Sequence, residues 1–154
     1  MIDKFERNVI ITALCISGLF IFSLFYAMGA KKADVTECLP YDKSYETARV
    51  NQVDKNTYQI FYVARMWNFE PSITYIPVGS EVDLFLTSLD VVHGFNIYNK
   101  NVNLMGVPGG VSKTTIRFDE PGVYKVVCHE FCGTGHQNMQ AEIIVNYPNK
   151  ISKR

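Results

Sequence analysis

The sequence predicts a mainly β domain, a sandwich or barrel of short strands, preceded by one transmembrane α-helix. Two observations carry this prediction. Residues 9–30 contain no charged side chain and are largely apolar, and about 20 such residues span a bilayer as a helix. From residue 57 onward, short runs of β-branched and aromatic residues are separated by glycine and proline turns, with no helical pattern between them.

The N-terminal region is expected to consist of a short polar tail, residues 1–8, and the membrane-spanning helix, residues 9–30. A cleaved signal peptide is the alternative, but signal cores are usually about 7–15 residues long and this run is longer. Lipoprotein processing at Cys38 is disfavoured because Glu37 precedes it and the apolar run has already ended. Basic residues flank both ends of the helix, so the positive-inside rule gives no orientation.

The remainder is divided into a polar connector, residues 31–56, the β domain, residues 57–147, and a C-terminal tail, residues 148–154. Within the domain, period-two alternation and short buried runs indicate the strands. The expected strands are 58–64, 73–77, 81–87, 95–98, 114–118, 123–127 and 141–145.

The segment 128–139, CHEFCGTGHQNM, concentrates side chains that bind soft transition metals. Its spacing, C-x3-C-x3-H-x2-M, differs from structural zinc patterns and from the C-x2-C-H of covalent haem attachment. An upstream histidine, His93, is available to complete the ligand set. His129 is assigned no ligand role and is expected to be exposed or to lie behind the ligands.

Two cysteines exceed the need of a mononuclear blue-copper site, which uses two histidines, one cysteine and a weak axial methionine. Cys128 and Cys132 lie four residues apart and can bridge two copper ions. His93 and His136 would then cap one ion each, with Met139 as a weak ligand, which is the binuclear CuA arrangement. A disulfide between the two cysteines and a Cys2His2 zinc site are the alternatives.

Composition excludes other classes. The formal net charge is zero, so there is no electrostatic footprint for nucleic acid. Four cysteines are too few for a disulfide scaffold.

Three motifs together resemble subunit II of the haem-copper cytochrome c oxidases: D-V-x-H-G-F, a following P-G, and C-x-E-x-C-G-x-G-H-x-x-M. The resemblance covers residues 58–145 and, more loosely, the order of anchor and domain. It implies a cupredoxin-like Greek-key barrel or sandwich with the metal held beside the loop between the last two strands. The sequence differs from two-helix forms of this subunit in two respects: it offers a single helix, and it has Val102-Asn103 where those forms carry a lysine and an acidic residue. In both respects it is similar to the shorter B-type (ba-type) oxidases.

The resemblance also implies roles for individual residues. The expected metal ligands are His93, Cys128, the main-chain carbonyl of Glu130, Cys132, His136 and Met139. In two-helix relatives the carboxylate of the glutamate that matches Glu130 also reaches a magnesium ion at the interface with subunit I. That magnesium role carries over less well than the copper-binding role of the carbonyl, which needs only the backbone. Trp67, the only tryptophan, stands where the family places an aromatic electron entry, although a core or rim position suits a lone tryptophan equally.

The implied function is electron transfer. A cytochrome c-type or cupredoxin donor would deliver electrons to CuA on the outer, periplasmic or extracytoplasmic side of the energy-conserving cell membrane. From there they would pass to haem, held only in subunit I, where oxygen is reduced. A stand-alone membrane-anchored cupredoxin with one copper is the alternative. A nitrous oxide reductase is excluded, because three histidines cannot supply its additional histidine-rich domain.

Overall fold

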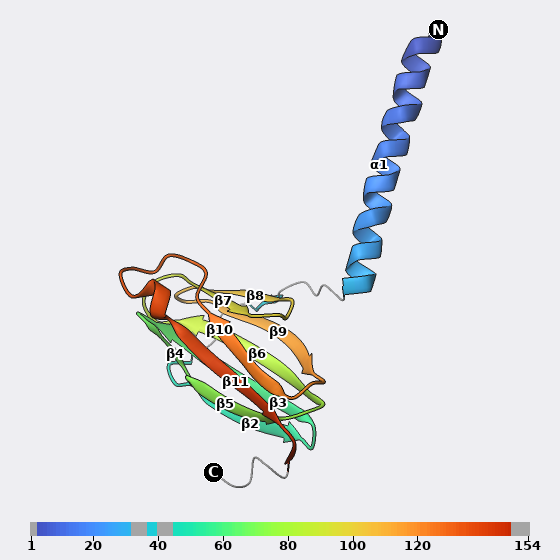
Figure 1. The fold of residues 1–154 in the computed structure, drawn as a ribbon. Coiled ribbons are helices and arrows are strands. Elements are labelled where there is room, and N and C mark those ends of the chain that lie inside the picture. Colours follow the sequence, from blue (N-terminus) through green and yellow to red (C-terminus); the bar gives the residue numbers. More distant parts are fainter. Residues whose placement is uncertain (1–2, 32–36, 40–44, 149–154) are drawn as a thin grey trace. The chain divides into compact units, whose positions relative to one another are not determined.

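The computed structural model describes residues 3–31, 37–39 and 45–148. The chain divides into two compact units, Met1–Asp34 and Val35–Arg154. The first contains a single helix and the second a sandwich of two sheets (Figure 1).

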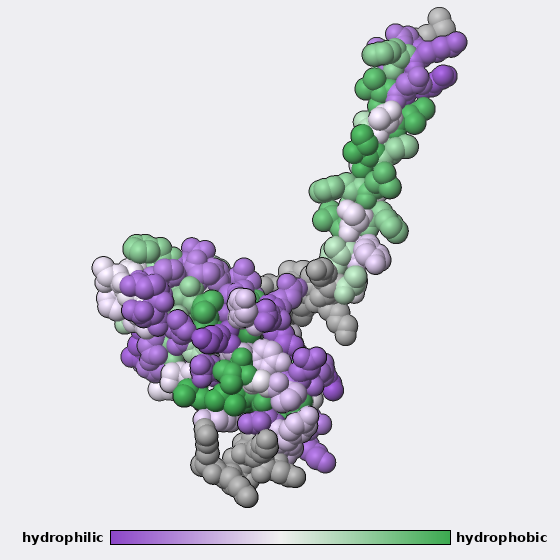
Figure 2. Space-filling view, viewed as in Figure 1, coloured by the Kyte–Doolittle hydropathy of each residue, from purple (hydrophilic) through white to green (hydrophobic). Residues whose placement is uncertain are grey.

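The first unit contains α1, Lys4–Lys31, 28 residues long and roughly 40 Å from end to end. Asp3 caps its N-terminus, since Oδ1 accepts the backbone N–H groups of Phe5 and Glu6. Beyond its first turns the helix is mostly apolar on the face seen in Figure 2, and none of its most apolar window is buried. The helix is long and apolar enough to cross a membrane. It starts inside the expected polar tail, whose charged residues form its first turn.

The second unit is mainly β, as the sequence predicts. One sheet has the strand order β1-β9-β6-β3-β2, with β4 also paired to β3. The strands of this sheet are β1 (Glu37–Leu39), β2 (Arg49–Asp54), β3 (Thr57–Arg65), β4 (Asn68–Glu70), β6 (Ser80–Ser88) and β9 (Val111–Phe118). The pairing of β3 with β6 is parallel and the other pairings in this sheet are antiparallel.

The other sheet has the order β5-β11-β10-β7-β8. Its strands are β5 (Ile73–Pro77), β7 (His93–Ile97), β8 (Val102–Gly106), β10 (Gly122–Val127) and β11 (Gln140–Asn146). Here β11 and β5 are parallel and the other pairs are antiparallel. The strands of each parallel pair are not consecutive in sequence. The chain crosses between the sheets: β5, for example, lies in this sheet, whereas β4 before it and β6 after it lie in the other.

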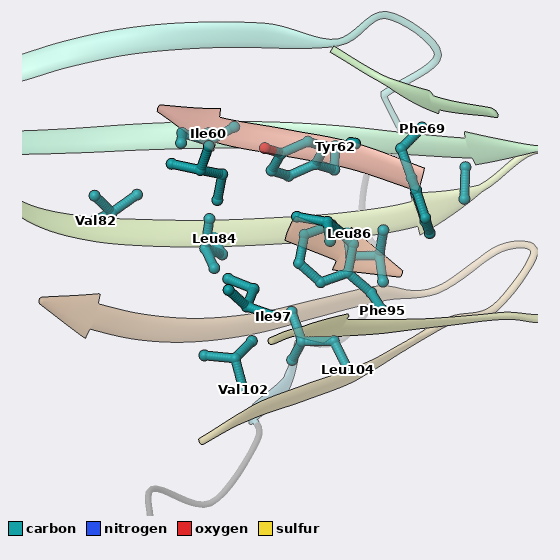
Figure 3. Packing of buried hydrophobic residues seen from close by; sticks show 14 of the residues in the cluster. Ile60, Tyr62, Phe69, Val82, Leu84, Leu86, Phe95, Ile97, Val102 and Leu104 are labelled. Carbon is teal, nitrogen blue, oxygen red and sulfur yellow. The ribbon is translucent and has the colours of Figure 1, made fainter. Parts of the chain in front are cut away.

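The core lies between the two sheets, where inward-facing residues alternate with outward-facing ones along the strands (Figure 3). In β11, for example, Ala141, Ile143 and Val145 are buried while the residues between them are not. Aromatic rings join the layers, because Phe95 of β7 packs against Tyr62 at 4.9 Å and against Phe69 at 5.3 Å. Each large side chain buried in this way contributes about 1.5–3 kcal/mol.

Strand pairing places the predicted metal-binding segments at one end of the sandwich. The loop 128–139 joins β10 to β11, and its base is closed by a hydrogen bond from Cys128 N–H to the Met139 carbonyl at 3.2 Å. β7 is the neighbour of β10, and His93 is its first residue. The loop and His93 therefore meet although His93 precedes Cys128 by 35 positions in the sequence.

The structure adds four strands to the expected set. Two of them, β1 and β2, lie inside the segment 31–56 that was expected to be connector, and β4 and β8 were also not anticipated. β2 is an edge strand with all six residues exposed, so it carries no apolar alternation. β1 and β4 have three residues each, too few for a periodic signal.

Candidate metal centre

The loop 128–139, called the ligand loop from here on, brings sulfur atoms together in a largely buried space. Cys128 and Cys132 are free thiols with their Sγ atoms 3.7 Å apart, well beyond the ~2.05 Å of a disulfide. The thioether of Met139 lies 3.7 Å from the sulfur of Cys132. All three side chains are buried. The disulfide that the sequence left open is therefore not formed in this structure.

Nitrogen and oxygen atoms complete the cluster. His136, at the start of the short 3-10 helix His136–Asn138, places Nδ1 3.6 Å from the sulfur of Cys132. The carbonyl oxygen of Glu130 lies 3.2 Å from the sulfur of Cys128. His93 comes from β7, and one ligand atom each from His93, Cys128 and Cys132 lie within 4.8 Å of one another.

His93 supplies the test of whether these residues suit a metal. Its side chain is completely buried. Nε2 is hydrogen-bonded to Oδ1 of Asp90 at 2.8 Å, whereas Nδ1 has no hydrogen-bond partner among the described residues. A buried nitrogen left without a partner is costly. A copper ion beside the two sulfurs would satisfy it, so the donor set fits a soft metal.

The side chain of Asp90 is surrounded by donors. Oδ2 accepts the backbone N–H of Met66 at 2.6 Å, and Oδ1 accepts that of Val91 at 2.6 Å as well as contacting His93. Burial opposes ionisation of Asp90, but these hydrogen bonds outweigh it and hold the pKa of the carboxyl below its ordinary value.

Burial also affects one thiol. It raises the pKa of Cys132 to about 11, and the neighbouring Cys128 adds to the effect through its hydrogen bond and its charge. Without metal, this side chain is held as a neutral thiol at neutral pH, and a bound metal would have to displace its proton.

Trp67 lies in the turn between β3 and β4 and covers one side of the ligand loop. Its indole N–H donates to the carbonyl of Cys132 at 3.0 Å. The ring lies so close to Gly133 and Gly135 that a Cβ added at Gly135 would be 2.4 Å from it. Trp67 is 41% exposed, which excludes the core position that the sequence left open and places it at the rim.

Two other loop residues flank the cluster. Phe131, between the two cysteines, is 82% exposed and faces the His136 ring with centroids 6.0 Å apart. His129 lies over Gly94, where a Cβ would be 2.5 Å from its ring. Its Nδ1 is 3.7 Å from the exposed carboxylate of Glu130. The side chain of His129 is partly exposed, at 29%.

All six residues expected as ligands thus come together from one loop and one neighbouring strand. Asp90 was not predicted to belong to the site, although the D-V-x-H motif contains it three residues before His93. The glycines at positions 94, 133 and 135 were also not predicted; they let the rings of His129 and Trp67 approach the backbone.

Comparisons with known proteins agree on one family. The sequence model for "Cytochrome C oxidase subunit II, periplasmic domain" matches residues 43–146. Cytochrome c oxidase subunit 2 of Thermus thermophilus is 38% identical over 96 residues, covering 62% of this chain and 71% of that protein. A second sequence from this species is equally similar over 96 residues, but the match spans only 57% of its length.

Solved structures give the same result. A chain in a cryo-EM structure of a heme-copper terminal oxidase dimer is 39% identical, with a TM-score of 0.82 over 93% of this chain and 100% of that one. The periplasmic domain of subunit II from Bradyrhizobium japonicum is 19% identical and has a TM-score of 0.58, covering 66% of this chain and 92% of that one. The second likeness concerns the fold alone, and it confirms the predicted cupredoxin-like architecture. On these matches and on its own architecture, the chain belongs to the cytochrome c oxidase subunit II family.

Proposed function

We propose that this chain is the electron-accepting subunit of a membrane-bound haem-copper terminal oxidase and holds a binuclear CuA centre. The observation that carries the proposal is the pair of buried free thiols 3.7 Å apart, with a ring nitrogen of His93 within 4.8 Å of both sulfurs. Nδ1 of that ring has no hydrogen-bond partner among the described residues. A mononuclear blue-copper site needs only one thiolate. A second buried cysteine at this distance is suited to bridging two ions.

The protein residues would each have a defined role. Cys128 and Cys132 would bridge the ions, and His93 and His136 would bind one ion each. Met139 and the carbonyl of Glu130 would act as weak ligands. When bound, such a centre supplies one-electron transfer.

The fold supports this role by holding the ligands rigidly. The loop begins and ends on paired strands, and its base is closed by the hydrogen bond between Cys128 and Met139. Three of the proposed ligand side chains, Cys128, Cys132 and Met139, are part of the continuous core of the sandwich. A rigid and largely dry site limits rearrangement when the charge changes and keeps water from the sulfurs.

Membrane attachment and partners follow from the same proposal. α1 would be a retained single-pass anchor, with the copper domain on the outer side of the energy-conserving membrane. A cytochrome c-type or cupredoxin donor would supply electrons, and haem in subunit I would receive them for oxygen reduction. Glu130 is the one acidic side chain of the loop, and its carboxylate would bind a hard cation such as magnesium only together with ligands from subunit I.

Copper stoichiometry tests the proposal. The full chain in detergent, reduced and loaded with copper, should contain two copper ions and a purple mixed-valence centre with one unpaired electron shared between both nuclei. Cys132→Ser should abolish this centre because a hydroxyl is a poor bridging ligand for soft copper. Cys15→Ser, in the exposed cysteine of α1, is the matched control and should leave it unchanged.

One copper with a blue spectrum would instead identify a stand-alone cupredoxin, and zinc in preference to copper would identify a Cys2His2 site. Either result would refute the binuclear centre.

A further inference from the structure

The carboxylate of Asp90 contacts two segments beside the proposed copper site that are distant from each other in the sequence. It follows β6 and stands three residues before His93. One oxygen contacts Nε2 of His93 at 2.8 Å, and the other accepts the backbone N–H of Met66 at 2.6 Å. Met66 directly precedes Trp67, whose indole is bonded to the ligand loop. Asp90 is therefore the link between His93 and the turn that carries Trp67.

The chemistry of these contacts determines where the proton of His93 lies. An ionised carboxylate only accepts hydrogen bonds. Oδ1 of Asp90 also accepts the N–H of Val91 at 2.6 Å, so it is already placed as an acceptor. Nε2 of a neutral His93 must then carry the proton. Nδ1 is left with a lone pair and has no partner among the described residues.

We propose that Asp90 is a positioning residue that fixes His93 in the Nε2–H tautomer, with Nδ1 presented to copper, and that seats the Trp67 turn on the ligand loop. This inference rests on the proposed copper function, because it concerns how one ligand is made ready for the metal. Partners behind a metal-bound histidine commonly fix the orientation and tautomer of its ring.

The first test needs neither copper nor a variant. Nitrogen NMR of the copper-free full chain in detergent micelles reports which ring nitrogen of His93 carries the proton. The expected result is a neutral ring protonated at Nε2. A neutral ring protonated at Nδ1, or an even mixture of the two tautomers, would overturn the proposal.

The second test removes the carboxylate. Asp90→Ala should mix the two tautomers, weaken copper binding about 10–100-fold and shift the midpoint potential of the loaded centre. Trp67 is the only tryptophan, so its fluorescence should move to longer wavelength as the turn loosens. Asp83→Ala is the matched control: Asp83 is 23% exposed against 24% for Asp90 and also accepts a hydrogen bond at 2.6 Å, from Thr115.

If Asp90→Ala does not fold, Asp90→Asn decides. An amide has one acceptor oxygen in place of two, so either the tautomer of His93 or the fluorescence of Trp67 must change. If both readouts match those of the Asp83→Ala control, Asp90 has no positioning role. A wild-type chain that takes up no copper would refute the proposed function, while the tautomer measured without copper would still judge the role of Asp90.

Discussion

Trp67 donates its indole N–H to the main-chain carbonyl of Cys132 at 3.0 Å, and its ring lies against Gly133 and Gly135. A half-exposed aromatic side chain is thus hydrogen-bonded directly to the backbone of an expected copper ligand. This contact makes two uses of Trp67 separable by experiment: electron entry from the surface, and mechanical support of the loop.

Trp67→Phe should slow electron uptake from reduced cytochrome c and leave the copper content unchanged. Phenylalanine keeps most of the ring contact with the loop but cannot donate the hydrogen bond, whose loss should lower the unfolding free energy by about 1 kcal/mol. Rapid-mixing kinetics and copper analysis check both expectations. Tyr75→Phe is the control, since Tyr75 on β5 is also 41% exposed. Unchanged uptake with lower stability would show that Trp67 is a rim support alone.

Gly135→Ala should displace Trp67 without altering any proposed ligand. The added Cβ would lie 2.4 Å from the indole ring, so the ring or the loop must move. We expect a loss of about 1–3 kcal/mol in unfolding free energy, the usual range for overpacking, together with a change in Trp67 fluorescence. In the control Gly122→Ala, the nearest atom to the new Cβ is 3.9 Å away. Equal stability of the two variants would contradict the close packing of Trp67 on the loop.

The stability of the copper-free chain should fall at alkaline pH because of Cys132. Its pKa is raised in the fold from an ordinary 9.0 to about 11. The folded state therefore favours the neutral thiol, and this contribution is complete below the ordinary pKa and is lost as the pH rises towards the raised one. Thermal unfolding between pH 9 and 11 should show the loss, and Cys132→Ser should diminish it.

Copper uptake should respond to pH in the opposite direction. The metal binds thiolate, so its affinity should rise with pH and binding should release protons, which a pH indicator in weak buffer can measure. Copper binding without proton release at neutral pH would mean that Cys132 is already ionised, contrary to the raised pKa.

The expected ligand set could be proposed from the sequence because most of it is local. Five of the six expected ligands occupy one twelve-residue loop, and the spacing of the loop residues does not depend on the rest of the fold. The strands with clear alternation or buried runs, such as β6 and β11, were predictable for a similar reason: each strand faces the core along its whole length.

The features that were missed depend on contacts between distant segments. No local pattern tells that Trp67 will lie on Gly135, 68 residues later, or that Asp90 will bond to Met66, 24 residues earlier. The edge strand β2 escaped notice because its six exposed residues have no core-facing side to set a period. Pairing with β3, not local pattern, makes it a strand.

Glu130→Gln should leave copper binding by the isolated chain nearly unchanged. The group near the sulfur of Cys128 is the main-chain carbonyl of Glu130, at 3.2 Å, and a carbonyl does not depend on the side chain. The carboxylate itself is 49% exposed, and its Oε1 lies 3.7 Å from Nδ1 of His129. An exposed contact of this length contributes little to stability.

Any effect of Glu130→Gln should therefore appear only in the assembled oxidase. Magnesium prefers six oxygen ligands in octahedral geometry, which one carboxylate cannot provide in the free chain. Metal analysis and electron transfer to haem in the complex should detect a loss of magnesium or a slower rate, with Glu142→Gln, on β11, as the control for a lost surface charge. Loss of copper from the isolated Glu130→Gln chain would mean that the side chain is itself a ligand, and the carbonyl role would then be wrong.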